Sequence, residues 1–183
     1  MLRVGPYITG ELDLGGLPSW LLRDVEQNAT RARAIRTVDP WWLHYVERFL
    51  TTALTPLAEA GAAYANGGPV VAVQIDDDSS ALGQPPLGGC NTTVTSCRYH
   101  GYLGALRDLV RAHGFDTTLI TTVGLSANIS TPGVLMTHEF ATVSQSCSDI
   151  QQELQQLRAV QPGRPMIVGE VRRATCHFPQ SCP

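Results

Sequence analysis

Acidic residues follow two short apolar runs, one in the middle of the chain and one near its end. Residues 69–75 (PVVAVQI) lead into three aspartates at 76–78, and residues 165–168 (PMIV) lead into a glycine and Glu170. A run of Val and Ile without alternation is typical of a strand buried on both faces. In barrels of alternating strands and helices, functional groups lie where such strands end. The two runs therefore predict a pair of carboxyl groups that face one substrate, the arrangement that cleaves glycosidic bonds.

The apolar pattern around these runs alternates between the periods of strands and helices. Asp39 before Pro40 is a good helix start, and Ser148 with Gln151 can form a capping box. We expect strands at residues 2–4, 69–75, 117–122, 134–136 and 164–169. We expect helices from residue 40 until Gly67-Gly68, with a kink or restart at Pro56, and at residues 99–113 and 148–160.

This alternation indicates an α/β fold with a parallel sheet or barrel. A complete barrel of this kind takes about 250 residues and about eight strands. The chain has 183 residues. We therefore expect residues 1–183 to form a single, incomplete barrel domain.

Composition excludes several classes of function. With 43% hydrophobic and 16% charged residues the chain is typical of a globular protein. The net charge of −3 provides no basic field, so we expect no nucleic-acid partner. No apolar run approaches the roughly 20 residues of a membrane span. We expect no signal peptide within this chain, because Gly5-Pro6 interrupts the apolar stretch near its start.

Three Asn-x-Ser/Thr sequons, at Asn28, Asn91 and Asn128, indicate a glycoprotein of the secretory route. Each motif alone is a weak signal, and together they favour this route.

The chain has five cysteines. Cys90 with Cys97, and Cys176 with Cys182, could each close a short loop, which would leave Cys147 unpaired. Zinc is the alternative, but no Cys-x-x-Cys or His-x-x-x-His spacing supports it, so we expect no metal site.

Four segments resemble, in order and spacing, the motifs of glycoside hydrolase family 35, the β-galactosidases. Residues 3–22 (RVGPYITGELDLGGLPSWLL) resemble that family's RPGPYICAEWxxGGLPxWLL, and residues 35–40 (IRTVDP) its (L/I)RTxDP. Residues 67–78 (GGPVVAVQIDDD) resemble GGPIIxxQxENEYG, and residues 164–170 (RPMIVGE) resemble xPxMxxEYWxGWF. The matches span essentially the whole chain.

The resemblance implies a partial (β/α)₈ barrel with roughly strands three to seven, and retaining hydrolysis of terminal β-D-galactosides without a cofactor. Glu170 matches the nucleophile, and Asp78 stands where the family has its acid/base Glu. Glu11 matches a ligand of the sugar hydroxyls, with Tyr7 nearby, and Asp77 replaces the Asn beside the acid/base. We also expect a place in the secretory pathway, which would be lysosomal, vacuolar or extracellular.

The chain departs from the family pattern within the site. Asp78 is one methylene shorter than Glu, and a misplacement of about 1 Å can lower the rate roughly a hundredfold. Asp77 lacks the amide donor of Asn and adds a charge. Ser79-Ser80 replace Tyr-Gly, and residues 171–175 (VRRAT) replace the aromatic segment after the nucleophile. These departures favour the alternative, a non-catalytic galactoside-binding or structural remnant of the same fold.

Other readings remain open for several polar and aromatic residues. The aspartate triplet is also compatible with a solvated turn or a calcium site, although no 12-residue calcium loop is present. We expect Trp41-Trp42 to begin a helix packed on the barrel wall rather than to form a sugar platform. His138-Glu139 follows the expected strand at residues 134–136, where barrel loops carry function.

Overall fold

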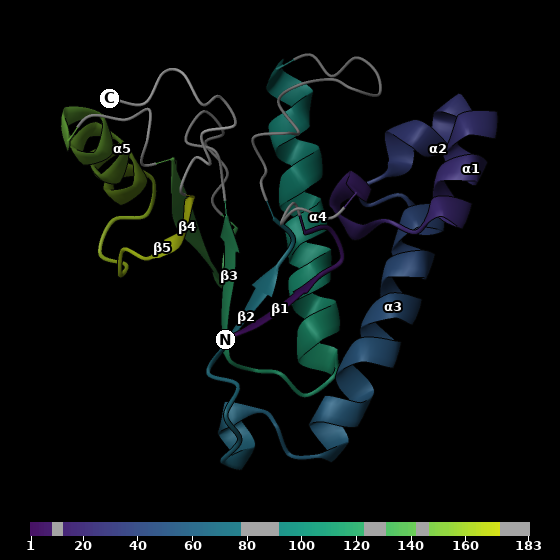
Figure 1. Ribbon diagram of the computed structural model, residues 1–183, viewed down its shortest axis with the longest axis horizontal. Coiled ribbons are helices and arrows are strands. Elements are labelled where there is room, and N and C mark those ends of the chain that lie inside the picture. The colour runs from purple at the N-terminus through teal and green to yellow at the C-terminus, as the bar shows by residue number, and fades with distance from the viewer. Residues whose placement is uncertain (9–12, 78–91, 123–130, 142–146, 173–183) are drawn as a thin grey trace, which may run out of the picture.

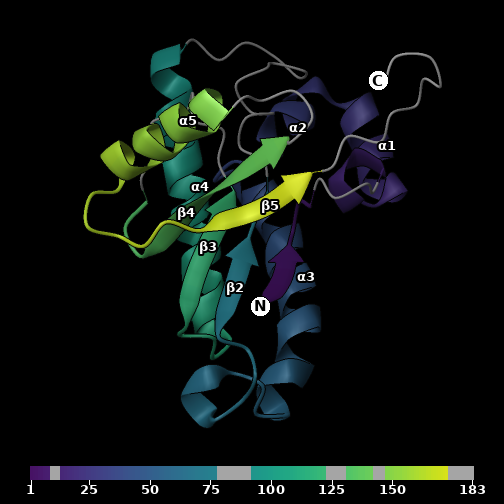
Figure 2. The same cartoon turned by 60° about the vertical axis from the view of Figure 1, so that its left-hand side comes forward.

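The computed structural model describes residues 1–8, 13–77, 92–122, 131–141 and 147–172, and every element below lies in these ranges. Five strands form one parallel sheet in chain order, and Figures 1 and 2 show it from two sides. The strands are β1 (Leu2–Gly5), β2 (Ala72–Ile75), β3 (Thr118–Thr122), β4 (Val134–Ala141) and β5 (Val168–Arg172).

Each strand pairs in parallel with the next strand along the chain. This order is that of an α/β barrel wall, whereas a doubly wound sheet reverses its order at a switch point. The sheet curls, and the arrowheads of all five strands point toward the same end (Figure 2). The carboxyl ends of the strands therefore share one edge, as the sequence predicts for a partial α/β barrel.

Five α-helices connect or flank the strands within the described ranges. They are α1 (Ser19–Gln27), α2 (Ala29–Ala34), α3 (Pro40–Glu59), α4 (Thr92–Ala112) and α5 (Cys147–Val160). Short 3₁₀ turns lie at Asp13–Gly16 and Tyr64–Asn66. Helix α4 packs on β2 and α3, and α5 packs on β4. No helix among these is both long and apolar enough to cross a membrane.

Helix α3 begins as the sequence predicts. The Asp39 side chain accepts a hydrogen bond from the Trp41 amide at 2.9 Å, and Pro40 occupies the first helical position. The expected end at Gly67-Gly68 is wrong, because the helix ends at Glu59. There Gly61 adopts a left-handed φ of 70°, a conformation that terminates helices. Pro56 lies inside the helix, which continues past it.

The core lies between β2, β3 and the apolar faces of α3 and α4. It includes apolar side chains of both helices, and Trp42 is only 2% exposed, whereas Phe49 of α3 is 45% exposed. The interpretation of Trp41-Trp42 as a helix start packed on the wall is therefore confirmed. The fully buried members of this cluster include Val46, Leu50, Leu54, Val73, Ile75, Tyr102, Leu103, Leu106, Val110 and Phe115.

Several predicted boundaries are wrong. Helix α4 begins at Thr92 rather than at the expected Tyr99. Its first two turns are rich in Thr and Ser and carry no apolar stripe, so the sequence pattern did not predict them. Helix α5 begins at Cys147, so Ser148 lies inside it and cannot be its N-cap. Helices α1 and α2 were not predicted, since both are short.

The last two strands also differ from the expected ranges. The strand expected at residues 134–136 continues to Ala141, which places His138 and Glu139 inside β4. The strand expected at residues 164–169 is shifted to Val168–Arg172, because its register with β4 begins at Val168, opposite His138. Apolar residues before the shift, such as Met166, remain partly exposed.

The predictions on cysteines and sequons are tested only in part. Cys147 is exposed and outside any disulfide, while the side chains of the other four cysteines lie outside the described residues. The two expected pairings therefore stay predictions. Asn28, the first sequon, is exposed, and its side chain caps α2 by accepting from the Thr30 amide at 3.0 Å. Asn91 and Asn128 lie outside the described residues.

Candidate active site

The predicted site residues lie at the carboxyl edge of the sheet, as far as the structure describes them. Asp76 and Asp77 follow β2 directly, and both are 0% exposed. Tyr7 follows β1 and is half-buried. Glu170 lies in β5, where the described part is its backbone. Asp78 and Glu11 lie outside the described residues.

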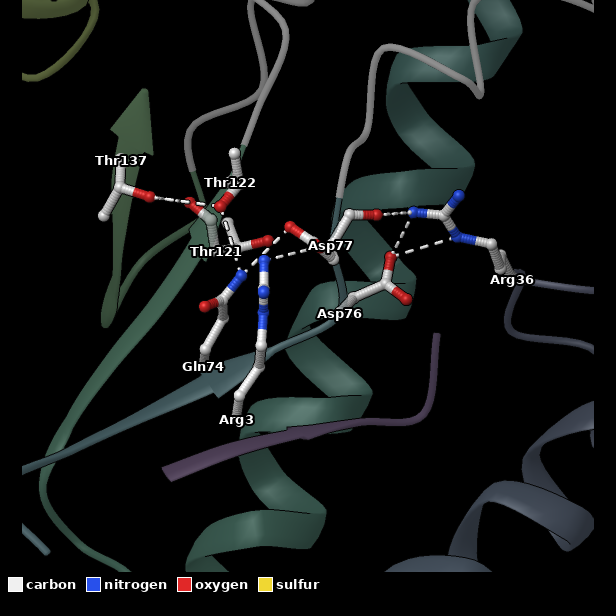
Figure 3. Close-up of polar contacts among 8 residues, drawn as sticks. All are labelled: Arg3, Arg36, Gln74, Asp76, Asp77, Thr121, Thr122 and Thr137. Atoms are coloured by element: carbon white, nitrogen blue, oxygen red, sulfur yellow. Dashed lines mark hydrogen bonds and ion pairs between the residues drawn. The ribbon is translucent and has the colours of Figure 1, made fainter. Parts of the chain in front are cut away.

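Asp77 lies at the centre of a buried hydrogen-bond chain (Figure 3). Its Oδ2 accepts from Arg3 Nη2 at 2.8 Å, and its Oδ1 accepts from Gln74 Nε2 at 3.0 Å. Gln74 Nε2 also lies 3.1 Å from Thr122 Oγ1, which is 3.3 Å from Thr137 Oγ1. The chain thus crosses β1, β2, β3 and β4. Both oxygens of Asp77 are held, and the Arg3 guanidinium balances its charge.

Asp76 forms a second buried ion pair, with Arg36 (Figure 3). Arg36 Nη2 and Nε donate to Asp76 Oδ2 at 2.6 and 3.1 Å, and Nη2 also donates to the Asp77 carbonyl at 2.6 Å. The side chains of Arg36 and Asp76 are 5% and 0% exposed. The two described aspartates of the triplet are therefore each paired with an arginine, and neither lies in a solvated turn.

Tyr7 joins this group through Arg36. The guanidinium carbon of Arg36 lies 4.1 Å from the centroid of the Tyr7 ring, a cation–π contact. The Tyr7 ring is also close to Gly15, where an added Cβ atom would overlap Tyr7 Cε2. Because Gly15 also has a left-handed φ of 67°, a glycine is required there. The structure thus brings Tyr7 and Asp77 together by way of Arg36.

A bulge in β5 positions the backbone of Glu170. His138 pairs with Val168 and Glu139 pairs with Glu170, so Gly169 is an extra residue on β5. A Cβ atom on Gly169 would lie 2.5 Å from Thr137 Oγ1 and 3.2 Å from Thr122 Oγ1. Gly169 therefore lies directly against the hydroxyl end of the Asp77 chain, which links the β5 segment to the turn after β2.

We expect Gly169→Ala to destabilise the protein by about 1–3 kcal/mol, because the added methyl group overpacks the space beside Thr137. Urea denaturation checks this value. Gly104→Ala is a matched control, since the nearest atom to its Cβ position is Arg107 Nη2 at 4.0 Å. In the helix interior that change should stabilise by roughly 0.4–1 kcal/mol. Equal free energies of unfolding for Gly169→Ala and the wild type would contradict the close contact at β5.

Sequence reasoning missed the partners of the aspartates. The sequence could have indicated Gln74, because a polar residue in an apolar strand requires hydrogen-bond partners when it is buried. Arg3 and Arg36 stand in the segments that resemble family motifs, but those segments do not reveal their partners, which lie 74 and 40 residues away in the chain. The sequence placed Glu139 in a loop after a strand, whereas the structure places it in β4 as the backbone partner of Glu170.

The remaining acidic and histidine residues do not form a metal centre in the described ranges. There, no group of at least three His, Cys, Asp or Glu side chains could hold a metal ion. His138 lies in β4 and its Nε2 is 3.0 Å from Glu153 Oε2, so it links the sheet to α5. His113 contacts Thr51 and the Leu109 carbonyl, whereas His44 is exposed.

Comparison with known proteins agrees with this arrangement. Residues 1–178 match the family described as Glycosyl hydrolases family 35. The chain is 39% identical to β-galactosidase 17 of Arabidopsis thaliana over 129 residues, which are 68% of this chain and 15% of that protein. It is 34% identical to β-galactosidase 8 of Oryza sativa subsp. japonica over 148 residues, 78% of this chain and 18% of that protein. It is 32% identical to the β-galactosidase of Mus musculus over 172 residues, 93% of this chain and 23% of that protein. The chain thus spans about a fifth of the length of these relatives.

Proposed function

Because the chain belongs to glycosyl hydrolase family 35, we propose that it carries part of the active site of a retaining glycoside hydrolase. Its substrates are terminal β-D-galactosyl residues, and no cofactor is used. The observation that carries the proposal is the sheet: the acidic turn after β2 and the backbone of Glu170 in β5 belong to parallel strands that share one carboxyl edge.

In this proposal the five strands correspond to strands three to seven of an eight-stranded barrel. The chain order of the sheet supports a run of consecutive barrel strands, because strands of such a barrel pair with their neighbours in sequence, and the numbers three to seven follow from the family resemblance. The chain of hydroxyl, amide and carboxylate groups around Asp77 then faces the barrel mouth, where this fold binds its substrates.

The proposed reaction has two steps. Glu170 attacks the anomeric carbon and forms a covalent galactosyl–enzyme, while Asp78 gives its proton to the departing glycosidic oxygen. Asp78 then takes a proton from water, which displaces Glu170 from the anomeric carbon and releases galactose. The two carboxyl groups of a retaining enzyme stand about 5–5.5 Å apart.

Three further residues contact the sugar in this proposal: Tyr7, Glu11 and Asp77. Asp77 is held on both oxygens by Arg3 and Gln74, so its remaining lone pairs have a fixed direction. An ionised carboxylate only accepts hydrogen bonds, so a galactose hydroxyl has to donate to it. This requirement differs from that of the Asn at the same position of the family, which can also donate.

We expect Asp78→Glu to raise kcat/KM for an aryl β-galactoside by up to about a hundredfold, since the longer side chain restores reach to the glycosidic oxygen. Release of nitrophenol from the nitrophenyl β-galactoside measures it. Asp78→Asn is the matched control, because it keeps the shape of the side chain and removes its proton.

Equal activities of the wild type, Asp78→Glu and Asp78→Asn would contradict the acid/base role of residue 78. Galactose binding without turnover in all three proteins would instead favour the alternative, a non-catalytic galactoside-binding remnant of the fold. If none of the three proteins binds or hydrolyses a galactoside, the structural remnant is the one interpretation left.

We also propose that the protein follows the secretory route to the lysosome, the vacuole or the cell exterior. The exposed position of Asn28 supports glycosylation at the first sequon. Protein from its natural source should lose mass on treatment with an N-glycosidase, and Asn28→Gln should lose less. An unchanged mass in the wild type would argue against this route.

A further inference from the structure

Within the described part of the chain, two residues other than glycine adopt a left-handed backbone conformation, Arg36 with a φ of 56° and Asp76 with a φ of 54°. This conformation is unfavourable for residues with a Cβ atom, and it persists only where the surroundings enforce it. Arg36 and Asp76 are also the two partners of one buried ion pair, at 2.6 Å. The loop before α3 and the turn after β2 are therefore fastened to each other at their two strained residues.

Arg36 holds the backbone of this turn as well as its side chain. Its Nη2 donates to the Asp77 carbonyl oxygen at 2.6 Å. That oxygen belongs to the planar peptide group that joins Asp77 to Asp78. A donor that holds the oxygen fixes the orientation of the whole peptide group. On the other side of the turn, the Asp76 amide donates to the Gly5 carbonyl at 3.0 Å, which ties the turn to β1.

The geometry points to Arg36 as a positioning residue, which sets the direction in which the chain enters Asp78. This inference rests on the proposed acid/base role of Asp78. Arg36 acts through the turn: its contacts include the Asp76 carboxylate, the Asp77 carbonyl and the face of the Tyr7 ring. None of these three contacts is with Asp78 or Glu170, the two side chains that react in the proposed mechanism.

All three contacts depend on the planar guanidinium. Two of its nitrogens converge on one carboxylate oxygen, one of them also reaches a carbonyl, and its carbon lies over an aromatic ring. A lysine ammonium keeps the positive charge but is a compact point charge without this fork or plane. Arg36→Lys therefore removes the orientation and retains the charge.

Arg31 provides a matched control for this substitution. Its Nη1 pairs with Asp24 Oδ2 at 2.8 Å, and its guanidinium carbon lies 5.4 Å from the centroid of the Trp41 ring. The same two kinds of contact are thus present, but the side chain is 40% exposed and lies outside the acidic turn. Arg31→Lys shows how much an arginine-to-lysine change outside the acidic turn alters the measured exchange rates.

Amide hydrogen exchange tests whether Arg36 holds the turn. In Arg36→Lys we expect the Asp76 amide to exchange about tenfold faster or more, because local opening of the turn becomes easier. The amide of Ile120 in β3 should accelerate by a smaller factor, since it exchanges through global unfolding and lysine keeps the charge that pairs with Asp76. Arg31→Lys should change neither amide. Equal acceleration at Asp76 and Ile120, or no acceleration at Asp76, would overturn the inference.

The dependence of activity on the leaving group tests whether holding the turn serves acid catalysis. Arg36→Lys should lower kcat/KM for phenyl β-galactoside, whose leaving group needs a proton, by about a hundredfold. For 2,4-dinitrophenyl β-galactoside, which departs without a proton, the loss should be no more than about threefold. A merely structural defect lowers both values equally, and that result would overturn the positioning role.

The two measurements separate the inference from the proposed function. If the wild type turns over neither galactoside, the proposed function fails, and the exchange experiment still decides whether Arg36 holds the turn. If the wild type is active and Arg36→Lys loses both substrates equally, the proposed function stands and the inference fails.

Discussion

Glu170→Gln lowers kcat for an aryl β-galactoside by roughly 10⁴-fold or more, the scale of loss when one member of a catalytic unit is removed. Glutamine keeps the size of the side chain, but its amide is neutral and cannot attack the anomeric carbon. The expected loss falls on kcat, because the covalent intermediate does not form. Steady-state kinetics with a nitrophenyl β-galactoside measure it.

The control for this variant is Glu139→Gln. Glu139 is the backbone partner of Glu170 on the neighbouring strand, so the two changes remove the same charge from adjacent positions. We expect Glu139→Gln to retain far more activity than Glu170→Gln. Comparable activities in the two variants, or a larger loss in Glu139→Gln, would contradict the assignment of the nucleophile to β5.

Asp76→Ala destabilises the protein by about 3–5 kcal/mol, since it leaves the Arg36 guanidinium buried without its carboxylate. Both side chains are nearly inaccessible, with exposed fractions of 5% for Arg36 and 0% for Asp76. Water cannot replace the lost partner without opening the turn. The free energy of unfolding from urea denaturation gives the size of this effect.

Asp24→Ala is the matched control. It removes the carboxylate partner of Arg31 from an ion pair whose side chains are 40% and 39% exposed. The expected cost is about 0.2–1 kcal/mol, as for other exposed pairs. If the two variants lost equal free energy of unfolding, the Arg36–Asp76 pair would behave as a surface pair, and its description as a buried ion pair would be wrong.

The elements that position the site were largely readable from local sequence. The run at residues 69–75 predicted β2 because Val and Ile suit a buried strand. The helix start at Asp39 followed from a capping side chain and a proline, and both are present in α3. The predicted ends of strands were wrong where hydrogen-bond pairing with a neighbouring strand determines them. Val71 lies in the predicted strand but is 51% exposed, because it precedes the paired residues.

The polar contacts of the site could not be read in the same way. Arg3 reaches Asp77 because β1 and β2 pair in parallel, and this pairing joins residues 74 positions apart. Arg36 reaches Asp76 because two left-handed residues bring two loops together, and neither residue is a glycine. Position along the chain predicts neither contact.

The meaning of the aspartate triplet changes as a result. As a sequence it suggested acidic groups crowded together at a strand end. In the structure, Asp76 is fixed by Arg36, and Asp77 is fixed by Arg3 and Gln74. Asp76 therefore supports the site through a buried contact, Asp77 is held in place for its proposed contact with the sugar, and the proposed bond-breaking chemistry is left to Asp78 and Glu170.

The most direct test of the central claim is to trap the covalent intermediate with 2-deoxy-2-fluoro-β-galactosyl fluoride. The fluorine at C2 slows both steps by destabilising the oxocarbenium-like transition state. The fluoride leaving group needs no proton, so the reagent does not depend on the reach of Asp78. Mass spectrometry of the digested protein should find one fluorogalactosyl group, on the peptide that contains Glu170. An adduct on another residue such as Glu139, or no adduct in a protein that also fails to hydrolyse aryl β-galactosides, would contradict the account.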